Sequence, residues 1–224
     1  MKERMYQILI ADDHSIVRYG TALVVKEILP AGTISEARNF DELLKLIDTQ
    51  TFDLLVLDIN IPGGNYLQMI DVIRLRQPAV KILVFSGYDE QLYALRYLQA
   101  GADGYVVKQA PEGELKTAIQ TILNNDKYIS PAIKQNLING LNAPKTGSGN
   151  PLNSLSNREM EVMQQLIKGA SIAEISQTLS LQISTVSTYK TRIFEKLEVN
   201  NVVALVEKVK LYDSPFTDNN GKAI

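Results

Sequence analysis

The chain has 224 residues, of which 45% are hydrophobic and 21% charged, a composition that can bury the core of one large domain or two small ones. It has no cysteine and one histidine, His14, which excludes disulfides, thiolate catalysis and zinc sites built from cysteine or several histidines. No apolar run approaches the roughly 18 residues of a membrane span, and residues 1–5 lead straight into a strand. We therefore expect a cytoplasmic protein with no membrane partner.

Short apolar runs alternate with amphipathic helical patterns over the first 124 residues. The expected strands are residues 7–11, 33–36, 54–57, 81–85 and 104–107, and the expected helices are 15–29, 40–49, 67–77, 89–100 and 111–124. This alternation predicts an α/β fold, a doubly wound five-stranded parallel sheet with helices on both faces. A further helix is expected over 131–141.

The composition changes after residue 141. Residues 142–151 are rich in turn formers and predict a flexible linker. Beyond them no strand pattern occurs, and Ser156 with Glu159 and Ser171 with Glu174 form two S-x-x-E capping boxes. The expected helices are 157–168, which Gly169 ends, and 172–179, 183–197 and 202–211. We expect domains at 1–141 and 152–213, the second smaller and all-α, and a disordered tail at 214–224.

Polar residues stand where four of the expected strands end. Asp12 and Asp13 follow the first strand, Asp58 the third, Ser86 the fourth and Lys108 the fifth. The carboxyl ends of parallel strands share one edge, so these groups are expected to meet in a crevice. Carboxylates there favour Mg²⁺, while the hydroxyl and the ammonium favour a phosphoryl group. Each residue also has a simpler interpretation as a helix cap, a turn residue or a solvated surface group.

Residues 6–125 resemble the receiver domain of two-component response regulators, on the evidence of Asp12-Asp13, Asp58, Ser86-Gly87, Tyr105 and Lys108. The resemblance implies a flavodoxin-like fold and phosphotransfer from a sensor histidine kinase to Asp58. It also implies Mg²⁺ at Asp13, Asp58 and the Asn60 carbonyl, with Asp12 acting through water. Ser86 would move toward the phosphoryl group, and Tyr105 would turn inward behind it.

The sequence departs from the receiver pattern at two positions near these residues. Tyr66 stands where receivers usually carry glycine, and Gln109 follows Lys108 where proline is common. Neither change removes a charged group, so Asp58 remains the expected phosphoacceptor. His14 is expected at the pocket rim, without a catalytic role.

A short helix, a bend and a longer second helix over residues 172–197 fit a helix-turn-helix. Val186, Ile193 and Leu197 form the expected inward stripe of the second helix. Its other face is polar, and Lys190, Arg192 and Lys196 form a basic line along it that can reach phosphates. From spacing alone, an ordinary helical bundle with a solvated polar face is an equal alternative.

Residues 152–211 resemble the LuxR-type helix-turn-helix of NarL/FixJ-class regulators, on the evidence of the stretches 155–162, 172–176 and 185–190 with Gly169. By position, the residues implied to face the DNA groove are Ser184, Thr185, Ser187 and Thr188, and those implied to approach its backbone are Lys190, Thr191 and Arg192. The helix over 202–211 would serve dimerisation. Gln182 is a poorer helix cap than the usual serine, and residues 151–213 hold seven basic and seven acidic side chains. We therefore expect modest affinity as a monomer, raised in a dimer by avidity.

Together these patterns predict a phosphorylation-switched transcription regulator that binds double-stranded DNA and forms a homodimer on activation. In one hypothesis the unphosphorylated receiver covers the recognition helix. Two alternatives remain from other classes. The first is a signalling scaffold that acts by protein contacts without DNA. The second is a Mg²⁺-dependent phosphatase of the haloacid dehalogenase type, which we disfavour because Asn60 stands where such enzymes carry a second aspartate. We expect no enzymatic turnover.

Overall fold

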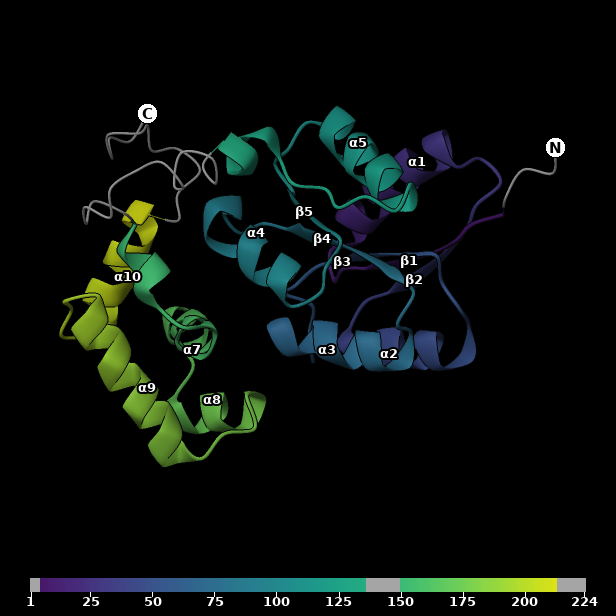
Figure 1. Ribbon diagram of the computed structural model, residues 1–224. Helices are drawn as coiled ribbons and strands as arrows, with labels where there is room; N and C mark the ends of the chain where they lie inside the picture. The colour runs from purple at the N-terminus through teal and green to yellow at the C-terminus, as the bar shows by residue number, and fades with distance from the viewer. Residues whose placement is uncertain (1–4, 136–149, 213–224) are drawn as a thin grey trace. The chain divides into compact units, whose positions relative to one another are not determined.

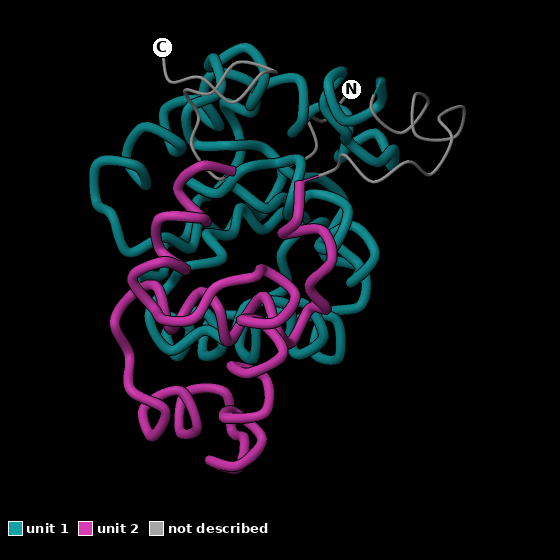
Figure 2. The backbone as a smooth tube through the Cα atoms, turned by 90° about the vertical axis from the view of Figure 1, so that its left-hand side faces the viewer, with its two compact units in different colours: residues 1–142 teal, residues 143–224 magenta. Residues whose placement is uncertain are grey.

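The computed structural model describes residues 5–135 and 150–212, and the chain divides into two compact units, 1–142 and 143–224, coloured separately in Figure 2. The expected linker up to residue 149, the end of the expected helix 131–141 and the expected tail lie outside the described residues. Residues 131–135 are helical. Among the described helices, none is both long and apolar enough to cross a membrane.

Unit 1 is built on a five-stranded sheet in the order β2-β1-β3-β4-β5, with every neighbouring pair parallel. The strands are β1 (Gln7–Ala11), β2 (Thr33–Ala37), β3 (Leu54–Leu57), β4 (Lys81–Ser86) and β5 (Gly104–Val107). Strands β3 and β4 are buried almost throughout, as expected for continuous apolar runs in a sheet covered on both faces. The expected fold class is confirmed.

Helices cover both faces of this sheet (Figure 1). On one face lie α1 (Ser15–Ile28) and α5 (Glu112–Leu123), and on the other lie α2 (Phe40–Thr49), α3 (Leu67–Arg76) and α4 (Glu90–Gln99). Alternate strand residues such as Ile8, Ile10 and Val56 pack with α1 and α5 in one apolar cluster. The sheet is thus fixed between two helical layers, which leaves its carboxyl edge free to carry polar groups.

Unit 2 is all-α over its described residues. A short 3-10 helix (Pro151–Ser154) precedes α7 (Asn157–Ile167), α8 (Ile172–Thr178), α9 (Ile183–Lys196) and α10 (Val202–Tyr212). Both capping boxes form: Ser156 accepts from the backbone N–H of Glu159, Ser171 from that of Glu174, and each glutamate bonds back to its serine N–H. Gly169 has a φ of 85°, the left-handed conformation that ends α7.

Where the observed element ends differ from the expected ones, they differ by one residue. Strand β2 extends to Ala37, and Ser86, expected just after the fourth strand, is the last residue of β4. Asp89 and Pro111 lie outside the helices expected to begin with them, as the N-caps of α4 and α5. Helix ends fray and caps are only half helical, so sequence periodicity does not resolve them.

Candidate functional site

The two buried aspartates of the sheet edge are held by backbone hydrogen bonds that continue the strand ladder. The Asp12 N–H donates to Ala37 O at 3.1 Å, and the Asp58 N–H donates to Ala11 O at 2.8 Å. Both aspartates are 3% exposed. The parallel register therefore brings together two carboxylates that are 46 positions apart in the chain.

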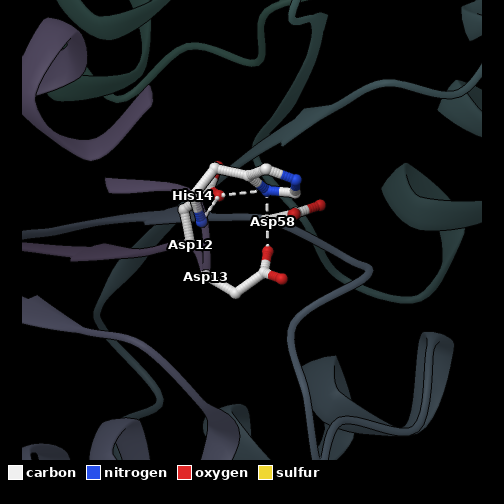
Figure 3. Close-up of side chains that lie close together, drawn as sticks. All are labelled: Asp12, Asp13, His14 and Asp58. Atoms are coloured by element: carbon white, nitrogen blue, oxygen red, sulfur yellow. Dashed lines mark hydrogen bonds and ion pairs between the residues drawn. The ribbon is translucent and has the colours of Figure 1, made fainter. Parts of the chain in front are cut away.

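Four side chains converge at this edge (Figure 3). One ligand atom from each of Asp12, Asp13, His14 and Asp58 lies within 4.8 Å of the others. The His14 ring is 60% exposed, and its Nδ1 lies 3.1 Å from Asp12 Oδ1 and 2.8 Å from Asp13 Oδ1. His14 is also the N-cap residue of α1, so the alternative that Asp12 caps this helix does not hold.

Lys108, just beyond β5, supplies the positive charge of the cluster. Its Nζ lies 2.6 Å from Asp12 Oδ2 and 2.9 Å from Asp58 Oδ2. The backbone N–H of Lys108 donates to Ser86 O at 2.7 Å. Burial acts to lower the pKa of Lys108, but the hydrogen bond to Asp12 and the charge of Asp58 outweigh it and raise that pKa. The ammonium group is therefore firmly charged between two buried carboxylates.

Asp58 experiences opposing influences on its ionisation. Burial raises the pKa of Asp58, while the Asn60 N–H, which donates to Oδ1 at 3.0 Å, and the Lys108 ammonium act to lower it. The net shift is upward, because desolvation is the largest effect. Asp58 also opens on a pocket of about 310 Å³, so a reactant can reach it. The other residues that line the pocket are His14, Val17, Asn60, Gly87, Tyr88 and Lys108.

Ser86 and Tyr105 are linked through the backbone of Tyr88. Ser86 Oγ accepts from the Tyr88 N–H at 3.1 Å, and the Tyr105 hydroxyl donates to Tyr88 O at 2.9 Å. Ser86 is fully buried, and Tyr105 is 1% exposed with its ring centroid 6.1 Å from that of Tyr97. In this structure Tyr105 thus already has the inward orientation that the resemblance assigned to the phosphorylated state. Sequence reasoning missed Tyr88, whose role lies in backbone atoms that carry no sequence signal.

The two departures from the receiver pattern have different structural consequences. Tyr66, the N-cap of α3, has a φ of 43°, a left-handed conformation that favours glycine, and its side chain is nonetheless buried. The backbone thus keeps the glycine-like geometry, at the cost of strain. The peptide bond between Lys108 and Gln109 is trans, like every other peptide bond of the described residues.

Sequence reasoning also missed Arg18, which lies next to the acidic cluster. It is 5% exposed on the inward face of α1, where Thr21 and Val25 are also buried. The sequence spacing did carry a signal, because Arg18, Thr21 and Val25 lie at positions i, i+3 and i+7 of this helix, the spacing of one buried face.

In unit 2, α8 and α9 form a helix-turn-helix. Ser180, in the turn, has a φ of 52°, and the Ser176 hydroxyl donates to Leu181 O at 2.6 Å, which fastens the turn to α8. Val186, Ile193 and Leu197 are each fully buried, so the expected inward stripe of α9 is confirmed. Gln182, the N-cap of α9, makes no side-chain capping bond.

The outer face of α9 carries the residues expected to contact DNA. Ser184, Ser187, Thr188, Thr191 and Arg192 are exposed, while Thr185 and Lys190 are partly buried.

Two lysines of α9 make contacts within unit 2. Lys190 Nζ lies 5.4 Å from the centroid of the Phe194 ring. Lys196 has a different environment from the one expected, because its Nζ lies 2.7 Å from Glu159 Oε2 and donates to Ser154 O at 3.1 Å. The ammonium of Lys196 thus ties α9 to the start of α7.

Comparison with known proteins follows this division of the chain. Residues 8–120 match the response regulator receiver domain, and residues 153–209 match the bacterial regulatory proteins of the luxR family. The oxygen regulatory protein NreC of Staphylococcus carnosus is 32% identical over 92% of this chain and 99% of its own length. The response regulator GacA of Pseudomonas aeruginosa is also 32% identical, over 90% of this chain and 94% of its own.

Solved structures agree in fold. RcsB from Salmonella enterica serovar Typhimurium, bound to promoter rprA in the presence of the phosphomimetic BeF3⁻, superposes with a TM-score of 0.77 over 92% of this chain and 99% of its own, at 24% identity. The two family matches and the near full-length relatives confirm the resemblance drawn from the sequence. The chain belongs to the two-component response regulators of the NarL/FixJ class, transcription regulators that join a receiver domain to a LuxR-type helix-turn-helix domain.

Proposed function

We propose that Asp58 accepts a phosphoryl group from the phosphohistidine of a sensor kinase, and that the aspartyl phosphate switches DNA binding by α9. One observation carries the proposal: the buried Asp58 carboxylate contacts the Lys108 ammonium while it opens on a pocket at the carboxyl edge of the sheet. An ammonium is suited to pair with phosphoryl oxygens. The family assignment supports the same reaction class.

The transfer follows from the atoms present. An Asp58 oxygen attacks the phosphorus, a P–O bond forms, and the P–N bond breaks. The kinase histidine leaves as neutral imidazole if its other ring nitrogen carries a proton. Lys108, 2.9 Å from Asp58 Oδ2, is placed to pair with the phosphoryl oxygens as negative charge accumulates there.

The donor set of the site suits Mg²⁺. The carboxylates of Asp12, Asp13 and Asp58 converge, they are hard oxygen ligands, and with one lysine they leave an excess of negative charge. We propose that Asp13, Asp58 and the Asn60 carbonyl hold the ion and that Asp12 acts through water. When bound, Mg²⁺ offsets charge on the phosphoryl oxygens.

The readout begins at Ser86. When the Ser86 hydroxyl donates to a phosphoryl oxygen, its hydrogen bond from the Tyr88 N–H is perturbed. The Tyr105 hydroxyl donates to the carbonyl of the same residue. A charge change at Asp58 therefore biases the β4–α4 segment through these two hydrogen bonds.

On the output side we propose double-stranded DNA as the partner of α9. Its exposed hydroxyls of Ser184, Ser187 and Thr188 are suited to base edges or phosphates, and Arg192, with Lys190 and Thr191, to the backbone. Helix α10 is the proposed dimer surface, since it exposes Val203 by 70% and Leu211 by 60%. Because Lys196 already pairs with Glu159, we rank it below Arg192 as a phosphate contact.

The phosphoacceptor is tested by labelling with a small phosphodonor in the presence of Mg²⁺. The wild type and the surface control Asp48→Asn should incorporate acid-labile phosphate with a stoichiometry near one, and Asp58→Ala should incorporate none. Stoichiometric labelling of Asp58→Ala would assign the acceptor elsewhere. Catalytic turnover of a chromogenic phosphate ester would favour the phosphatase alternative. That activity would require the amide of Asn60 to take the place of a general acid.

DNA binding is tested by selection from a random duplex pool with and without the phosphodonor. Arg192→Ala should weaken binding to every selected duplex and reduce its salt dependence, whereas the charge-matched control Lys116→Ala on α5 should not. Absence of any duplex enrichment in both phosphorylation states would favour the scaffold alternative.

A further inference from the structure

Arg18 is a buried cation that the phosphotransfer scheme above does not use. Its side chain, 7% exposed, reaches from α1 into the space between the ends of β1 and β2. Burying a guanidinium group is costly unless its donors are satisfied, and here two of them are. One of these partners belongs to the acidic cluster itself.

The first contact of Arg18 is with the backbone of Asp12. An Arg18 terminal nitrogen (Nη1) donates to Asp12 O at 2.8 Å, within a buried environment. On its other side, Asp12 is held by its own N–H, which donates to Ala37 O of β2. The carbonyl that Arg18 binds is part of the peptide group that joins Asp12 to Asp13, so this bond restrains the direction in which the chain continues to Asp13.

The second contact joins the guanidinium to β2 through a carboxylate that is 49% exposed. Arg18 Nε lies 3.0 Å from Glu36 Oε2, and Glu36 lies on β2, paired in register with Ile10 of β1. The planar fork of an arginine can bind both partners at once, whereas a lysine offers a single ammonium group. Arg18 therefore connects the edge strand to the loop that carries the acidic pair.

Asp13 depends on this support more than its neighbours do. Asp12 and Asp58 are buried and bound to Lys108, whereas the Asp13 side chain is 35% exposed and its carboxylate contacts the ring of His14, which is itself 60% exposed. Such an exposed contact holds a side chain weakly. The position of the Asp13 carboxylate thus follows mainly from its backbone.

We propose that Arg18 is a positioning residue for the divalent-cation site: by fixing the peptide between Asp12 and Asp13, it directs the Asp13 carboxylate toward Asp58. This proposal rests on the proposed function, because it assumes that Asp13 and Asp58 bind the ion. Groups that orient metal ligands affect metal affinity by roughly 10-fold or more when they are removed. A purely structural role would instead lower stability and leave the affinity unchanged.

The test is titration of the metal-free, full-length protein with Mn²⁺, followed by the EPR signal of the free ion. Arg18→Met should bind Mn²⁺ about tenfold more weakly than the wild type. Arg74→Met is the matched control, because Arg74 also donates to a backbone carbonyl, Gly101 O, and pairs with Asp103, but at the amino end of the sheet. It should lower the melting temperature and keep the wild-type affinity.

A second measurement separates an effect on metal affinity from an effect on the phosphorylation of Asp58. Labelling of Arg18→Met by a small phosphodonor should be slow at low Mg²⁺ and approach the wild-type rate at saturating Mg²⁺, because Asp58 and Lys108 are unchanged. Wild-type Mn²⁺ affinity in Arg18→Met would overturn the proposal. If that variant fails to fold, Arg18→Lys decides: it should bind Mn²⁺ several-fold more weakly, and wild-type affinity would again overturn the proposal.

A different set of results would refute the proposed metal site at Asp13 and Asp58. Asp13→Asn should lose most of the Mn²⁺ binding of the wild type. Retention of full affinity in Asp13→Asn, or no binding by the wild type, would refute the metal site on which the proposal rests, whatever Arg18→Met does.

Discussion

Replacement of Lys108 by methionine tests the electrostatic design of the site most directly. Methionine keeps much of the length and apolar stem of lysine and removes only the ammonium group. That group lies 2.6 Å from Asp12 and 2.9 Å from Asp58, whose side chains are 4% and 3% exposed. Three carboxylates and one ammonium in the wild type become three carboxylates alone.

The expected cost is set by the two buried carboxylates that lose their partner. Removing one member of a buried ion pair costs about 3–5 kcal/mol, because the remaining charge is left desolvated. We expect the lower end of this range, about 3 kcal/mol at pH 7, because Asp58 opens on a pocket that lets solvent reach its carboxylate. The cost should shrink as the pH falls and the carboxylates become protonated, and also when Mg²⁺ restores positive charge. The pKa of Lys108 is raised, so its stabilising effect is fully present below its usual value of 10.5 and is lost as the pH rises through the raised one.

Amide hydrogen exchange of β3 and β4 in the full-length, metal-free protein measures the free energy of unfolding of unit 1 separately from that of unit 2. Lys116→Met, which removes an exposed ammonium from Glu27 and Glu112, is the control and should leave this protection unchanged. A loss below about 1 kcal/mol for Lys108→Met would show that the ammonium does not neutralise the cluster. A loss of equal size with and without saturating Mg²⁺ would contradict the metal site.

Four further predictions concern ionisation, packing and capping. Burial raises the pKa of Asp58, so its carboxyl ¹³C resonance should titrate above 3.8 in metal-free buffer; a midpoint at or below 3.8 would contradict this. Because the pKa of Asp58 is raised in the folded protein, its contribution to stability is fully present below pH 3.8 and is lost as the pH rises through the raised pKa. Asp58→Asn should therefore increase the free energy of unfolding of unit 1 at pH 7. Gly104→Ala would place a Cβ 2.8 Å from Ile122 Cδ1 and 3.0 Å from Tyr128 Cβ, and should cost about 1–3 kcal/mol in denaturant unfolding; an unchanged midpoint would show that this contact can relax. Ser156→Ala should cost about 1 kcal/mol, measured by exchange of the α7 amides, with no change in unit 1.

Much of the fold was predictable because its signals are local. The run Leu54–Leu57 is apolar throughout and short, which is typical of a buried parallel strand, and the two S-x-x-E boxes mark the starts of α7 and α8. Local signals were weaker at element ends, where Asp89 and Pro111 proved to be caps instead of helical residues. Propensity and periodicity describe a segment, whereas a cap is defined by which backbone N–H groups lack a helical partner.

The strand-end rule also predicts the acidic site from the sequence alone. Asp12, Asp58 and Lys108 meet because parallel strands place their carboxyl ends at one edge, which follows from topology alone. The order of the strands in the sheet decides which strand ends are neighbours, and the local sequence pattern does not predict that order.

From the amino-acid sequence alone one can predict the class of fold, the family and the chemical identity of the groups at the sheet edge. The neighbour of each polar group depends instead on how the elements pack. Arg18 turns inward to the Asp12 carbonyl and Glu36, Lys196 turns back to Glu159, and Ser86 and Tyr105 both bond to the backbone of Tyr88. The physical reason is that long polar side chains have many rotamers of similar energy in isolation. The choice among them is made by burial and by partners that are distant in sequence, and both exist only once the elements have packed.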